Sequence, residues 1–328
     1  NKVFASWTQA AWTDAESGVH PEENGYLLTV YKDGEKVADM PVSMDTGTVS
    51  YDISKYIDAS EKGTYTFGLI TKGYVTDNTS EEKILVFASN EAKSADSAAG
   101  GSIESGPVTA PKISFAEREG DSTSYPVYLT DPAGSERPSD TARYRVTVTG
   151  TYQGATKEVA FETDQTSFDL TALNRDGTFA APKPGDFMYR SENGNFYADN
   201  ADYTVSAAAV PSNTALNTES EEVNKTDEFR LAELDNAALD PSITTVNGKT
   251  AVSWKEDVPG AAAYTVTVVL PNGDNFEGEL NISGSQCDIT EALKNGAGKY
   301  QVKVSAVPVE WSTVYKAGTS DLELTVLA

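Results

Sequence analysis

One pattern occurs three times along the chain and limits the possible folds more than any other feature. Each copy contains a run that starts with tyrosine and places apolar residues at every second position: Tyr26–Val30, Tyr144–Val148 and Tyr264–Val268. This alternation directs one face of the segment inward and the other outward, which predicts a half-buried β-strand. A unit that recurs at a nearly fixed period predicts a row of similar domains.

Two further elements follow this strand in every copy. The first has an aspartate between two apolar residues and then a hydroxyl residue: Tyr51-Asp52-Ile53-Ser54, Phe168-Asp169-Leu170-Thr171 and Cys287-Asp288-Ile289-Thr290. The aspartate points outward and can cap the following turn. The second is another alternating strand, starting at Tyr65, Tyr203 or Tyr300. We expect ten side chains to turn inward: Tyr26, Ile53, Tyr65, Tyr144, Leu170, Tyr203, Trp254, Tyr264, Ile289 and Tyr300.

The chain as a whole is expected to be an all-β protein of three tandem antiparallel β-sandwich domains. The basis is the many short strands, the frequent turn residues and the lack of any long helical pattern. The expected domains span residues 1–88, 111–231 and 236–328. The stretch 89–110 is rich in Ser, Ala and Gly and is expected to be a flexible linker, and a short hinge is expected at about 232–240.

The copies differ at their starts. Copies two and three carry an additional opening strand, at 111–114 and 241–244, for which copy one has no counterpart. Either the opening strand of copy one is missing, or Trp12 rather than Trp7 corresponds to Trp254 of copy three. The sequence leaves both alternatives open.

The third copy carries the clearest family pattern. An inner tryptophan (Trp254), a tyrosine opening the next strand (Tyr264), an aliphatic residue (Ile289) and a second tyrosine before alternating Val and Ala (Tyr300) occur in order. This arrangement resembles fibronectin type III-like, immunoglobulin-like β-sandwich repeats, and the resemblance implies that the Tyr300 hydroxyl bonds back to an upstream backbone group. The Asp-Ile-Thr and Asp-Ile-Ser turns look like the variant in secreted or surface proteins of Gram-positive gut bacteria. No Arg-Gly-Asp tripeptide is present, so no integrin-type function is carried over.

The charge and cysteine content narrow the possible partners and the expected compartment. Acidic residues outnumber basic ones by 50 to 25, which gives a formal net charge of -25. A uniformly acidic surface repels phosphate groups, so neither nucleic acid nor an anionic membrane surface is an expected partner, and no apolar stretch is long enough to insert into a bilayer.

A single cysteine permits no intrachain disulfide, which favours a bacterial source. We expect an extracellular, monomeric protein, secreted or attached to the cell surface.

Few residues offer catalytic or metal-binding chemistry. His20 is the only histidine, which excludes a multi-histidine zinc site. Cys287 occupies the position of Tyr51 and Phe168, so it is expected to be a buried small hydrophobe rather than a nucleophile. An acidic cluster in copy two could hold a calcium ion but does not match an EF-hand loop: Asp199, Asn200 and Asp202. We therefore expect no enzyme, no cofactor and no metal.

One segment departs from the repeat. The interval from Phe168 to Tyr203 is more than twice the corresponding interval in either other copy, because residues 174–200 are inserted there. Its aromatic residues suggest a ligand-binding platform made by three of them: Tyr189, Phe196 and Tyr197. The alternative is a loop folded down over its own sandwich.

Trp311 is a second candidate binding residue, because it lies in the loop between the last two strands of copy three. Loops at the ends of sandwich domains often carry recognition. It can equally pack on its own loop, or against a partner that a neighbouring module would supply. The leading functional hypothesis is a non-catalytic spacer or scaffold in a larger secreted or surface protein. The alternative is an adhesion module that binds a glycan or a host or cell-surface protein through the insertion.

Overall fold

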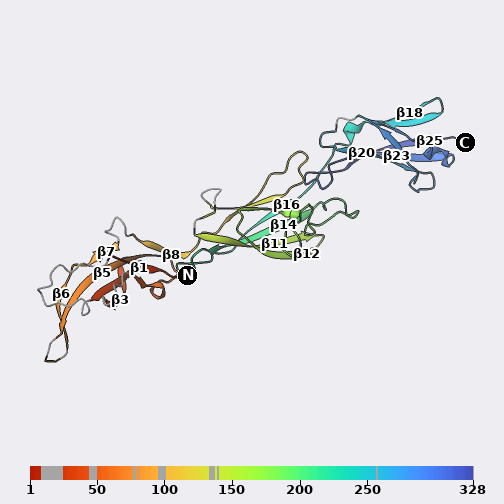
Figure 1. Cartoon of the computed structure of the whole chain (residues 1–328). Helices are drawn as coiled ribbons and strands as arrows, with labels where there is room; N and C mark the ends of the chain where they lie inside the picture. Colours follow the sequence, from red (N-terminus) through yellow and green to blue (C-terminus); the bar gives the residue numbers. More distant parts are fainter. Residues whose placement is uncertain are drawn as a thin grey trace.

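The computed structural model describes residues 1–8, 25–43, 50–76, 79–80, 82–94, 101–132, 137–138, 140–255 and 258–327. These residues form three β-sandwiches arranged end to end (Figure 1). We call them module 1 (residues 1–107), module 2 (108–231) and module 3 (232–327). The part of the chain that is described contains no α-helix, and none of its helical turns could cross a membrane. The predicted all-β fold with tandem sandwiches is therefore confirmed.

Each module pairs a small sheet with a larger one. In module 1 the small sheet holds β1 (Phe4–Ser6) and β4 (Ser50–Asp52). The larger sheet of module 1 consists of β3 (Glu35–Ser43), β2 (Gly25–Lys32) and β5 (Gly63–Thr76), with β6 (Lys83–Ala88), β7 (Ala92–Lys93) and β8 (Ile103–Pro107) paired along β5. A 3-10 turn, Ser54–Tyr56, follows β4.

Modules 2 and 3 extend the same plan. The sheets of module 2 are β9 (Lys112–Phe115), β10 (Pro126–Thr130) and β13 (Ser167–Asp169), opposite β12 (Ala155–Thr163), β11 (Thr141–Tyr152), β14 (Ala201–Pro211) and β16 (Val223–Phe229). Those of module 3 are β18 (Ser242–Val246), β19 (Lys249–Ser253), β22 (Gln286–Asp288) and β21 (Asn281–Ser283), opposite β20 (Ala263–Val269), β23 (Gly298–Val307) and β25 (Gly318–Val326). Short 3-10 turns lie at Leu170–Ala172, Ala237–Leu239 and Ala292–Asn295.

The predicted inward residues form three separate cores. Nine of the ten are buried, and they lie among the apolar side chains of their own module. Tyr264 is half-buried and packs against Trp254 with ring centroids 5.7 Å apart. Alternation along each strand therefore identified the core faces correctly.

The aspartate motif makes the same hydrogen bonds in all three modules. The side chain of Asp52 accepts from Ser54 N at 3.1 Å, and the equivalent bonds to Asp169 and Asp288 are 3.0 and 2.9 Å long. In each module the amide after the aspartate donates to a backbone oxygen in or directly before the neighbouring strand (β1, β10 or β19), for example from Ile53 N to Val3 O at 2.9 Å. The motif thus caps a turn and fixes one strand to its neighbour, as predicted.

The tyrosine that opens the long strand ties its hydroxyl to an upstream backbone group in every module. Tyr300 Oη donates to Gly296 O at 2.6 Å, which confirms the expected tyrosine corner of module 3. Tyr65 Oη accepts from Asp58 N at 2.9 Å. In module 2 the bond comes from the insertion, since Tyr189 N donates to Tyr203 Oη at 3.0 Å.

Strand register decides which tryptophan of module 1 corresponds to Trp254. Ala5 lies opposite Tyr51 in the way that Val252 lies opposite Cys287, which aligns Trp7 with Trp254. Trp7 also packs edge-on against Tyr26 with ring centroids 5.3 Å apart. Trp12 lies outside the described residues. Trp7 is thus the core tryptophan of module 1, and among the described residues no opening strand precedes it.

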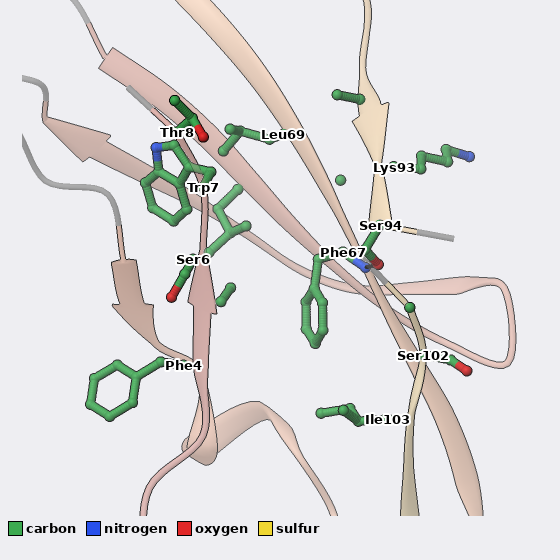
Figure 2. A pocket seen from close by; sticks show the side chains of 15 residues that line it. Phe4, Ser6, Trp7, Thr8, Phe67, Leu69, Lys93, Ser94, Ser102 and Ile103 are labelled. Atoms are coloured by element: carbon green, nitrogen blue, oxygen red, sulfur yellow. Dashed lines mark hydrogen bonds between the residues drawn. The ribbon is translucent and has the colours of Figure 1, made fainter. Parts of the chain in front are cut away.

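The structure corrects the described parts of the expected linker at 89–110, whereas residues 95–100 lie outside the described residues. Residues 92–93 and 103–107 form β7 and β8, and both strands pair with β5 of module 1 (Figure 2). Gly63 lies opposite Ser105, whose hydroxyl donates to Glu61 O at 2.9 Å. The described end of this stretch is therefore part of a sheet and not a flexible connection.

Candidate functional site

The insertion of module 2 folds down over its own sandwich. Its main chain bonds to the 3-10 turn that follows β13, with Gly185 N donating to Thr171 O at 2.8 Å and Phe187 N donating to Leu173 O at 3.0 Å. A Cβ at Gly185 would lie only 2.3 Å from Leu173 O, so a glycine is needed for this close approach. Phe187 and Met188 are buried in the module core. The alternative of a loop that covers its own domain is the arrangement found.

Tyr189 takes part in the packing of the insertion against module 2. Its ring lies against the core, and its hydroxyl donates to Ala155 O at 3.0 Å. The ammonium group of Lys157 lies 4.0 Å from the ring centroid. Burial, with a smaller contribution from Arg175, lowers the pKa of Lys157 to about 8. The ring and hydroxyl of Tyr189 are thus engaged within the module.

Tyr197 is even less accessible. Its side chain is 2% exposed and packs edge-on against Phe229 with ring centroids 6.0 Å apart. Its other neighbour is Trp311 of module 3, at 5.3 Å. Desolvation raises the pKa of the Tyr197 hydroxyl. Phe196 is half-buried, and its main chain closes a small loop with Ser191.

These positions correct the prediction of an aromatic platform made by Tyr189, Phe196 and Tyr197. A platform needs several ring faces open to one side, whereas two of the three rings pack on protein atoms. The physical reason is the large apolar area of an aromatic ring, whose burial is favourable wherever a neighbouring surface is in reach. The sandwich beneath the insertion and the next module both provide such a surface.

Trp311 belongs to the junction between modules 2 and 3. It projects from the loop between β23 and β25, adopts a positive φ of 61° and packs against the core of module 2. The guanidinium group of Arg190 lies 5.2 Å from its ring centroid. The structure therefore brings together two residues that the sequence suggested separately as ligand contacts, Tyr197 and Trp311, and they contact each other.

Polar contacts surround this aromatic pair. Thr313 is fully buried, and its backbone N donates to Ser122 O at 2.9 Å while Arg118 Nη1 donates to Thr313 O at 2.6 Å. Lys316 Nζ lies 3.0 Å from a carboxylate oxygen of Asp199. The other oxygen of Asp199 accepts from Leu231 N at 2.9 Å. Module 3 is thus bound to module 2 by hydrogen bonds as well as by ring contacts.

A parallel strand pair completes this junction. β17 (Ala232–Glu233) pairs with β24 (Tyr315–Lys316), and Ala232 N donates to Val314 O at 2.8 Å. The chain passes from one core to the next within three residues, because Leu231 is buried in module 2 and Leu234 in module 3. The expected hinge at 232–240 is therefore corrected, since its first residues are paired.

The junction between modules 1 and 2 has the same design. β15 (Asn217–Thr218) lies in the loop between the last two strands of module 2 and pairs in parallel with β8. Gly106 N donates to Leu216 O at 3.1 Å, and Val108 N donates to Thr218 O at 3.0 Å. Leu216 packs against the core of module 1, whereas Val108 is buried in that of module 2.

The remaining candidate site residues either contact other residues of the protein or lie outside the described residues. Cys287 is buried, and desolvation raises the pKa of its thiol to about 11, so the thiolate that a nucleophile needs is disfavoured. Asp202 forms an ion pair with Arg230 at 3.1 Å. Within the described ranges no cluster of His, Cys, Asp or Glu could hold a metal ion. His20 lies outside those ranges.

No family model matches the sequence, and the search of curated proteins returned no match. Among solved structures, a two-domain fibronectin type III segment from chicken tenascin aligns with 66% of this chain and 99% of its own length, at 15% identity and a TM-score of 0.25. The chicken CNTN1 FN1–FN3 domains align with 99% of this chain and 94% of their own, at 12% identity and a TM-score of 0.24. Both the identities and the TM-scores are low, so the fold is assigned from the strand order and register described above and not from these alignments.

Proposed function

We propose that this chain is a stiff, non-catalytic spacer that holds other parts of a larger protein at a fixed separation. The observation that carries the proposal is the repeated design of the two junctions. In each, the segment entering a module pairs in parallel with the loop between the last two strands of that module. Modules 2 and 3 are therefore each connected to the preceding module by the same kind of strand pairing.

Several properties of the junctions support stiffness. Adjacent cores lie at most a few residues apart, and the intervening backbone is hydrogen-bonded to the following module. The ring contact of buried Tyr197 with half-buried Trp311, together with buried Thr313, adds side-chain contacts at the second junction. Domains in one chain usually move against each other unless their interface is extensive, so these contacts oppose bending at both joints.

The acidic composition suits an extracellular spacer attached to or secreted from a bacterial cell. A net charge of -25 on 328 residues keeps copies apart and favours a soluble monomer. The alternative, adhesion through the aromatic insertion, loses its main support because Tyr197 and Trp311 cover each other. No ligand is therefore assigned to the insertion.

Small-angle scattering combined with array binding tests this proposal. A stiff spacer is expected to keep one maximum dimension from low to high salt, because backbone pairing does not depend on the screened Lys316–Asp199 pair. It is also expected to give no signal above background on glycan and extracellular-protein arrays. A maximum dimension that varies with salt, or saturable binding that Tyr189→Ala abolishes, would contradict the proposal.

A further inference from the structure

Four Asn-Gly pairs lie within the described residues, at 193–194, 247–248, 272–273 and 295–296. In such a pair the backbone nitrogen of the glycine can attack the side-chain carbonyl carbon of the asparagine, because glycine has no Cβ to hinder the approach. All four asparagines are exposed, so solvent access does not distinguish them. The attack also needs a free glycine N–H and a free asparagine side chain, and in these two respects the pairs differ.

The pair at 193–194, in the insertion of module 2, has both reacting groups held. The side-chain oxygen of Asn193 accepts from Ser191 Oγ at 2.6 Å and from Asn195 N at 3.1 Å. The nitrogen of Gly194 donates to Ser191 O at 2.8 Å. Attack would therefore require three hydrogen bonds to break first.

The pair at 272–273 of module 3 is held in the same way. Asn272 Nδ2 donates to Asp274 Oδ2 at 2.7 Å, and the side-chain oxygen of Asn272 accepts from Asp274 N at 3.1 Å. Gly273 N donates to Leu270 O at 2.9 Å. Here too the nucleophile and the carbon that it would attack are both fixed by hydrogen bonds.

The pair at 247–248 forms the tip of the hairpin between β18 and β19. Val246 lies opposite Lys249, and both tip residues have positive φ, 52° at Asn247 and 75° at Gly248, as this two-residue turn requires. Among the described residues, neither the side chain of Asn247 nor the nitrogen of Gly248 has a hydrogen-bond partner. Val246 beside the tip is 64% exposed, so the last pair of the hairpin can open locally at small cost.

We infer that Asn247 is a site of spontaneous deamidation, with the Gly248 nitrogen as the nucleophile and water as the second reactant. The nitrogen gives up its proton to the solvent and bonds to Cγ of Asn247, and the side-chain nitrogen leaves as ammonia. Water then opens the cyclic imide at either of its carbonyl carbons. An aspartate or an iso-aspartate is left at this position, so the reaction consumes water and releases ammonia.

The product changes module 3 without altering either junction. A carboxylate replaces a neutral amide at an exposed tip, and the iso-aspartate form lengthens the main chain of the turn. Within the described residues, β18 and β19 pair only with each other and with β22, so the change lies outside the pairs that join the modules. The modification therefore marks the age of a molecule while the connections between its modules are kept.

Peptide mapping by mass spectrometry of the folded full chain, aged in mildly alkaline buffer, tests the inference. Asn247 is expected to deamidate at least about tenfold faster than Asn193 and Asn272, because each of those pairs must first break three hydrogen bonds. Asn295, whose Nδ2 donates to Ala292 O at 2.9 Å, is expected to be intermediate. A rate at Asn193 or Asn272 that equals the rate at Asn247 would overturn the inference, as would the absence of product at Asn247.

The same chain in concentrated urea is the control for effects of the local sequence. Unfolding removes the hydrogen bonds of all four pairs, so their rates are expected to converge. If Asn247 kept its full lead in urea, the ranking would come from the neighbouring residues and not from the structure, and the inference would fail.

Two variants test the assignment from opposite directions. Asp274→Ala removes the acceptor of Asn272 Nδ2 and is expected to raise the rate at Asn272 severalfold, with the rate at Asn247 unchanged. Asn247→Gln lengthens the side chain and disfavours ring closure, so the aged protein should contain fewer acidic charge variants. Circular dichroism melts confirm that both variants are folded. An unchanged rate at Asn272 in the first variant, or an unchanged yield of acidic forms in the second, would contradict the assignment.

Discussion

Trp311 of module 3 packs against Tyr197 of module 2, with ring centroids 5.3 Å apart and ring planes inclined at 59°. The contact joins the insertion that distinguishes module 2 to the loop of module 3 that carries β24. It gives the insertion a structural role, because the extra residues both cover their own sandwich and form a contact surface for module 3. The unusual length of this segment is thereby explained without a ligand.

Removing the Trp311 ring is expected to weaken the energetic coupling between modules 2 and 3. Trp311→Ala should reduce the coupling free energy by about 1–3 kcal/mol, less than for a fully buried tryptophan because Trp311 is half-buried. In differential scanning calorimetry, modules 2 and 3 should then melt as more widely separated transitions. Tyr128→Ala, which truncates an exposed aromatic residue of module 2, is the control. Identical calorimetric profiles for Trp311→Ala and wild type would contradict this role.

The core tryptophan of module 3 is expected to behave differently. Trp254 is 5% exposed, and Trp254→Ala should lower the free energy of unfolding of module 3 by about 3–5 kcal/mol. The loss should appear as early melting of module 3, while the transition of module 1 stays near its wild-type temperature. Early melting of module 1 would contradict the separation of the cores.

Gly106 provides a test of the first junction. It adopts a φ of 127°, and a Cβ there would lie 3.0 Å from Lys62 Cα, so Gly106→Ala is strained in both torsion and space. We expect a loss of about 1–3 kcal/mol in the free energy of unfolding of module 1, measured by urea denaturation. Gly101→Ala has open space around the added methyl group and is the matched control, expected to be near neutral.

How far the sequence predicts this structure depends on the kind of interaction. Alternation predicted the strands that bury a face, and the aspartate motif predicted a turn that forms with the same bonds three times. β8 was missed because Ile-Glu-Ser-Gly-Pro has no alternation of apolar residues. Backbone pairing holds it to β15, with one side-chain hydrogen bond from Asn217 Nδ2 to Gly106 O. The partnership of Tyr197 with Trp311 was missed because it depends on how two modules meet and on a positive φ at Trp311.

The packing of the insertion predicts a specific dependence of stability on pH. Lys157 has a pKa lowered to about 8 in the folded protein, mainly by burial, against 10.5 as its ordinary value. Between these values the unfolded chain binds more protons than the folded one, so the free energy of unfolding should rise from about pH 8 to pH 10.5. In urea titrations from about pH 8 to pH 10.5, the Lys157→Met variant should lack the rise in the free energy of unfolding that Lys157 contributes.

The control for this prediction is Lys299→Met, which replaces an exposed lysine of module 3. Its urea midpoints should follow those of the wild type over the same pH range. If Lys157→Met also followed the wild type, the side chain of Lys157 would not be desolvated beside Tyr189. The packing described for the insertion would then need revision.

A spacer function requires both junctions to be stiff, and pulsed electron paramagnetic resonance measures the spread of distances across each of them. Nitroxide labels at Glu35, Glu158 and Glu323 report one exposed position in each module, in a Cys287→Ser background that removes the only native thiol. We predict a single narrow distance distribution for the pair 35 and 158 and another for the pair 158 and 323, with Trp311→Ala broadening only the second. Broad distributions across both junctions of the otherwise unmodified chain would contradict the account.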